Sequence, residues 1–103
     1  MATDKQVIEE FLEGLWEVRV HSMMGEYVVY CREKAVGSVC DNMLYVKITP
    51  ASVSMLTPLA VPRIPPYVGA KPCFQIQIAE MRKEFIQQLL IAVSNEILPK
   101  KKR

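Results

Sequence analysis

The sequence is poor in the residues from which catalytic and metal sites are usually built. It has one histidine, His21, and three cysteines, and no two cysteines form a C-x-x-C pair. Zinc sites generally need four such ligands at familiar spacings, so we expect no metal and no cofactor. A glycine-rich phosphate loop, H-E-x-x-H and G-x-S-x-G are also missing. His21 is the one candidate general base, and a surface histidine is the commoner role.

Long hydrophobic runs are missing as well. No apolar stretch approaches the roughly 20 residues that a membrane-spanning helix needs. The first residues, MATDKQVIEEF, place acids where a secretory signal needs a basic end followed by an apolar run. These observations predict a cytoplasmic protein with no membrane partner.

Positive charge is scarce outside the last four residues. The chain has 13 basic and 11 acidic residues, but Lys100 to Arg103 are all basic. Without them the remainder has nine basic and eleven acidic residues, whereas duplex binding normally relies on a basic surface. We expect one folded domain at residues 1–98 and a disordered basic tail at residues 99–103.

Apolar and polar side chains alternate through much of residues 27–49. This pattern predicts three short strands joined by two tight turns. The second turn is Asp41-Asn42, because both residues tolerate the positive φ that two-residue hairpins require. It sets Val39 opposite Leu44 on an apolar face.

The first turn falls at Arg32-Glu33, which contains no residue that accepts positive φ easily. With that turn, Tyr27, Ser38 and Tyr45 form a row on the face opposite the apolar one. Val28 and Tyr30 then join the apolar face. Further residues predicted near the outer row are Val29, Val36 and Lys47.

Helical periodicity appears at both ends of the chain and once between them. Thr3 to Gln6 has the form of a capping box before an amphipathic helix. Thr49 and Pro50 predict the start of a short helix. The other predicted elements are a strand at residues 16–21, a proline-rich loop at 62–67, a strand at 73–78 and a long helix at 81–97. This order, α-β-β-β-β-α-β-α, predicts a two-layer α+β domain with an antiparallel sheet of about five strands and helices on one face.

Three segments resemble those of a known family. HSMMGEY at residues 21–27, CDNMLYVK at 40–47 and PPYVGAKP at 65–72 are similar to the segments that mark the N-terminal domain of the bacterial competence regulator TfoX. That family includes small proteins made of this domain alone. The resemblance implies a bacterial cytoplasmic protein with a secretion-chaperone-like fold and a role linked to competence or transcription. It supplies no catalytic residues.

Three functions remain open from the sequence. The first is a protein-interaction surface, or a homodimer contact, formed by the outer row with Tyr27, Tyr45 and Lys47. The second is nucleic-acid binding, with the same two tyrosines as stacking platforms and the basic tail as an anchor. The third is a small anionic ligand held by the loop that contains Tyr67 and Lys71. Scattered exposed apolar side chains and a simple connecting loop are the alternatives without function.

Overall fold

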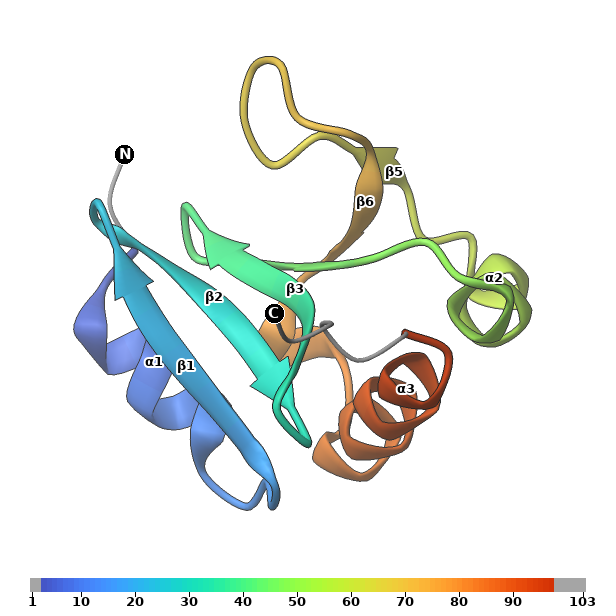
Figure 1. Cartoon of the computed structure of the whole chain (residues 1–103), viewed down its shortest axis with the longest axis horizontal. Helices are drawn as coiled ribbons and strands as arrows, with labels where there is room; N and C mark the ends of the chain where they lie inside the picture. Colours follow the sequence, from blue (N-terminus) through green and yellow to red (C-terminus); the bar gives the residue numbers. More distant parts are fainter. Residues whose placement is uncertain (1–2, 98–103) are drawn as a thin grey trace, which may run out of the picture.

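A six-stranded antiparallel sheet with helices packed on one face forms the domain (Figure 1). The computed structural model describes residues 3–97, so the predicted basic tail at 99–103 lies outside the described residues. The strands lie in the order β1-β2-β3-β4-β6-β5. The helices are α1 (Lys5–Leu12), α2 (Pro50–Leu56) and α3 (Lys83–Asn95), with short 3-10 turns η1 (Thr57–Leu59) and η2 (Ile78–Glu80). The strands are β1 (Val18–Met23), β2 (Glu26–Cys31), β3 (Lys34–Cys40), β4 (Met43–Val46), β5 (Arg63–Ile64) and β6 (Cys73–Ile76).

The predicted α+β class and element order are confirmed, and the sheet gains one short strand. β5 has two residues and lies at the sheet edge, inside the segment predicted to be a loop. Pro62 and Pro65 flank it, and a proline has no N–H to donate to a sheet. The strand is therefore short and confined to the edge.

The core lies between the sheet and the helices. Phe11 of α1 and four residues of α3 are buried against side chains of the central strands. Fully burying an aliphatic or aromatic side chain stabilises a fold by about 1.5–3 kcal/mol. The largest buried core side chains are Phe11, Phe74, Leu44, Leu56, Ile86, Leu89 and Leu90. Within residues 3–97, no helix has the length and hydrophobicity that crossing a membrane would require.

Both predicted hairpin turns are confirmed. Asp41 and Asn42 have φ of 51° and 66°, and Arg32 and Glu33 have φ of 52° and 66°. Such left-handed backbone costs roughly 1–2 kcal/mol at residues other than glycine, asparagine and aspartate. Contacts with the chain before β1 and with β1 offset that cost. The Arg32 amide donates to the Glu17 carbonyl at 2.9 Å, and the Glu33 carboxylate pairs with Arg19 at 2.9 Å.

A β-bulge at Val36 overturns the predicted outer row. Tyr30 pairs with Ala35 but Val29 pairs with Gly37, so Val36 is an extra residue in β3. One inserted residue exchanges the two faces of the strand beyond it. Val29 and Val36 are therefore core residues. The predicted register, which had no bulge, placed them on the outer face of the sheet.

The same bulge corrects the placement of Tyr27 and Val28. Tyr27 pairs with Val39 and packs against the edge of the core, so it does not belong to the outer row. Val28 pairs with Ser38 and lies on the outer face, where the sequence had placed it inside. The observed outer row is His21, Val28, Ser38, Tyr45 and Gln75.

The two predicted helix caps have different outcomes. α1 begins after Asp4 without a side-chain cap, so the capping box at Thr3 is wrong. The Thr3 hydroxyl instead donates to the Glu26 carboxylate at 2.6 Å. The cap at Thr49 is confirmed: its side chain accepts from the Ser52 amide at 3.2 Å, and its own amide donates to the Ser52 hydroxyl at 2.8 Å.

Candidate functional site

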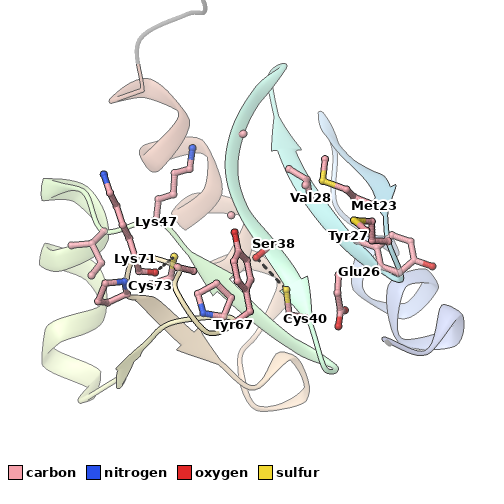
Figure 2. Close-up of a pocket in the computed structure, with 17 residues that line it drawn as sticks. Met23, Glu26, Tyr27, Val28, Ser38, Cys40, Lys47, Tyr67, Lys71 and Cys73 are labelled. Carbon is pink, nitrogen blue, oxygen red and sulfur yellow. Dashed lines mark hydrogen bonds between the residues drawn. The ribbon is translucent and has the colours of Figure 1, made fainter. Parts of the chain in front are cut away.

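The outer face of the sheet, opposite α1 and α3, bends into a hollow of about 1120 Å³ (Figure 2). We call this space the outer hollow. The floor comes from β2, β3 and the start of β6, one side from the β1–β2 hairpin, and the other from the loop at residues 66–72. Its lining residues are Met23, Met24, Glu26, Tyr27, Val28, Ala35, Gly37, Ser38, Cys40, Lys47, Ile48, Pro66, Tyr67, Ala70, Lys71, Pro72 and Cys73.

The loop side presents an aromatic ring to the solvent. Tyr67 is 67% exposed, and in Figure 2 its ring extends from the loop across the outer hollow. The Ala70 amide donates to the Tyr67 carbonyl at 3.1 Å and closes a turn. Gly69 has φ of 91° in that turn, a conformation that glycine adopts without strain. The turn therefore fixes the backbone from which the Tyr67 ring extends.

Two lysines border the outer hollow. Lys47 follows β4, and its carbonyl accepts from the Ser52 hydroxyl at 2.8 Å. Lys71 comes from the loop, and Figure 2 shows both side chains extending in the same direction. Both are exposed, and neither ammonium forms an ion pair with an acid among residues 3–97. This side of the hollow is therefore locally positive.

The single acid among the lining residues already has partners. The Glu26 carboxylate accepts from the Thr3 hydroxyl at 2.6 Å and from the Asp41 amide at 3.3 Å. It lies at the β1–β2 side, and Figure 2 shows its carboxylate directed away from the two lysines. Within residues 3–97, the positive side of the hollow thus has no acidic counter-ion.

Four of the five predicted binding residues border the outer hollow: Tyr27, Lys47, Tyr67 and Lys71. Tyr45 does not. It is on the outer face as predicted, but only 5% exposed, and its hydroxyl accepts from the Gln75 side-chain amide at 2.9 Å. Figure 2 shows the Tyr27 ring pointing away from the hollow. The structure therefore does not bring Tyr27 and Tyr45 together as a pair of exposed stacking rings.

Two thiols contribute to the lining. Cys40 is buried and Cys73 is half-buried. Burial raises the pKa of both thiols above its ordinary value, although nearby Lys47 acts in the opposite direction on Cys73. The thiolate is the nucleophilic form of cysteine, so these side chains lack the activation that a thiol catalyst requires. Their positions suit them to be small, polarisable packing groups.

Other chemistry is sparse around the hollow. His21 lies on the outer row but is not among the lining residues. In the part of the chain that the structure describes, no three histidine, cysteine or acidic residues gather closely enough to hold a metal ion. The arrangement is thus suited to binding by shape, apolar contact and positive charge.

Sequence reasoning missed the methionines at the β1–β2 side. Met24 and Gly25 form the turn of this hairpin, both with positive φ, and the Met24 side chain is 99% exposed. Met23 is also exposed and, like Met24, lines the hollow. A glycine after an apolar residue between two alternating strands was the available signal. A large side chain in a two-residue turn points to solvent because the turn leaves it no neighbour to pack against.

Comparison with known proteins gives no match to a protein-family model, a curated protein or a solved structure. The resemblance to the TfoX N-terminal domain therefore rests on the three sequence segments and stays a prediction. Two of those segments, residues 40–47 and 65–72, supply the lysine side of the outer hollow, with Lys47, Tyr67 and Lys71.

Proposed function

We propose that this domain is a non-enzymatic protein-interaction domain, and that the outer hollow receives a segment of its partner. The observation that carries the proposal is an apolar hollow on the face that the helices leave uncovered, bordered by exposed Met24, Ile48 and Tyr67. Contiguous exposed apolar surface is typical of interaction sites, and methionine and tyrosine are enriched at their centres.

The chemistry of the lining supports binding over catalysis. Burial raises the pKa of the Cys40 and Cys73 thiols, which disfavours the nucleophilic thiolate. The nucleic-acid alternative relied on Tyr27 and Tyr45 as exposed stacking rings. Tyr45 is buried and the Tyr27 ring points away from the outer hollow, so this support is missing. The alternative of a small anion bound at the loop is consistent with Lys71, and Lys47 also borders the hollow. The same two lysines could equally well bind an acidic side chain of a protein partner.

The resemblance to the TfoX N-terminal domain supports a regulatory role, linked to competence or transcription, in the bacterial cytoplasm. A second copy of the chain is one partner of this kind. Sedimentation velocity over a hundredfold range of concentration would detect such a homodimer, and Ser38→Trp would abolish it if the outer hollow is the contact.

Selection from a random dodecapeptide library displayed on phage tests the interaction site. The full chain would be panned in parallel with Ser38→Trp and Ala70→Trp, which place an indole in the outer hollow from the floor and from the loop. Ser54→Trp is the matched control, because Ser54 is exposed on α2 and does not line the hollow. Circular dichroism would show that each variant is folded.

We expect peptides that bind the native chain and the Ser54→Trp control and lose at least tenfold in affinity for a folded hollow variant. Native-like binding by both hollow variants, or the absence of any selected peptide, would refute the proposal.

A further inference from the structure

We infer that the segment bound in the outer hollow is extended, about six residues long, and combines apolar side chains with a carboxylate held between Lys47 and Lys71. This inference rests on the function proposed above and specifies the chemistry of the partner. It follows from three properties of the hollow: its charge, its width and the side chains at its two ends.

The chain is acidic outside its last four residues but has a positive site at the outer hollow. Without Lys100 to Arg103 the chain has nine basic and eleven acidic residues. Several other basic side chains already have partners: Arg19 and Arg32 form ion pairs, and the Lys83 ammonium donates to backbone carbonyls of α1 and the turn after it. Lys47 and Lys71 both border the hollow and have no acidic partner among residues 3–97. A ligand carboxylate would supply the missing counter-charge.

The outer hollow extends across most of the sheet. The lining residues come from β1, β2, β3 and β6 and from the residues that follow β4. Five strands spaced about 4.8 Å apart span roughly 19 Å, which is the length of an extended peptide of about six residues. A single bound anion would fill only the lysine side and leave the apolar remainder in contact with water. A short stretch of chain fills both parts.

The end of the hollow opposite the lysines indicates which side chains the rest of the bound segment should carry. Met23 and Met24 are exposed there, and Val28 lies on the floor. Methionine is flexible and adapts to apolar side chains of different shape. We therefore expect tolerance of the type of apolar residue at this end and a stricter requirement for negative charge at the other.

The double variant Lys47→Gln with Lys71→Gln tests this inference. Its matched control is Lys5→Gln with Lys34→Gln, which removes the same charge from two positions that do not line the hollow. The probes are synthetic, fluorescein-labelled versions of the peptides selected on the native chain, together with a labelled twelve-nucleotide thymidine strand. Fluorescence anisotropy would give the affinity of each full-length chain at 50 and 300 mM salt.

We expect the selected peptides to be enriched in aspartate or glutamate next to apolar residues. Their affinity should fall about tenfold in the Lys47→Gln, Lys71→Gln chain and less than twofold in the control, with the difference shrinking at high salt.

Selected peptides without acidic residues, or an equal loss in both double variants, would overturn the inference and leave the interaction site intact. Loss of binding to Ser38→Trp identifies the site independently of charge, so failure of the two proposals can be told apart. A thymidine strand that binds more tightly than the peptides and depends on the same lysines would overturn the peptide assignment in favour of nucleic acid.

Discussion

Gly37 is a position at which one added methyl group should strongly destabilise the fold. A Cβ atom at residue 37 would lie 2.0 Å from the Tyr45 carbonyl oxygen and 3.0 Å from its carbonyl carbon. Both are backbone atoms of the paired strand β4, so no side-chain rotation relieves the contact. Gly37→Ala therefore forces β3 and β4 apart at the centre of the sheet.

Overpacking of this kind costs typically 1–3 kcal/mol, and the rigid neighbour places Gly37→Ala at about 3 kcal/mol. A domain of this size loses roughly 4–8 °C of melting temperature per kcal/mol, which predicts a decrease of about 12–24 °C. Urea denaturation followed by circular dichroism would measure the change in the free energy of unfolding.

Gly14→Ala is the control, because residue 14 has φ of 85° and nothing within 4 Å of the added Cβ. It should cost about 1 kcal/mol through backbone conformation alone. If Gly37→Ala were no more destabilising than Gly14→Ala, the close approach of β3 and β4 inferred here would be refuted.

Three further predictions concern single side chains. Ser52→Ala removes a buried hydroxyl that caps α2 and donates to a carbonyl, and should lower the free energy of unfolding by about 2 kcal/mol in urea titrations. The hydrogen bond and charge of Arg19 lower the pKa of Glu33, so their pairing is present at neutral pH and lost as pH falls through that lowered pKa; NMR titration should show the Glu33 pKa returning to its ordinary value in Arg19→Met. Burial raises the pKa of Cys73 and Cys31, so labelling by a disulfide reagent should be slow at pH 7 and accelerate above pH 9, with the half-buried Cys73 modified before the buried Cys31.

The sequence was most informative where local chemistry alone determines structure. The Asp41-Asn42 turn and the Thr49 cap each depend on a few neighbouring residues, and both are confirmed. The element order follows from hydrophobic periodicity for the same reason. These features can be inferred without knowledge of the packing between distant elements.

The outer face could not be derived in this way, because it depends on one inserted residue. A bulge leaves little local signal, since Val36 fits the alternation of β3 whether it points in or out. The uninterrupted register therefore placed Tyr27 in the wrong row. The lysine side of the hollow was easier to identify, because Lys47, Tyr67 and Lys71 lie in two segments that already stood out in the sequence.

The strand order also has a consequence for how the chain folds. β1 to β4 are joined by two-residue turns, so each pairs with its neighbour in sequence and these local contacts form rapidly. β6 pairs with β4 only after the chain has passed through residues 47–72, and closing that longer loop costs additional entropy. Since those residues carry Lys47, Tyr67 and Lys71, the lysine side of the outer hollow depends on this pairing, and a chain in which only the local hairpins have formed does not present it to a partner.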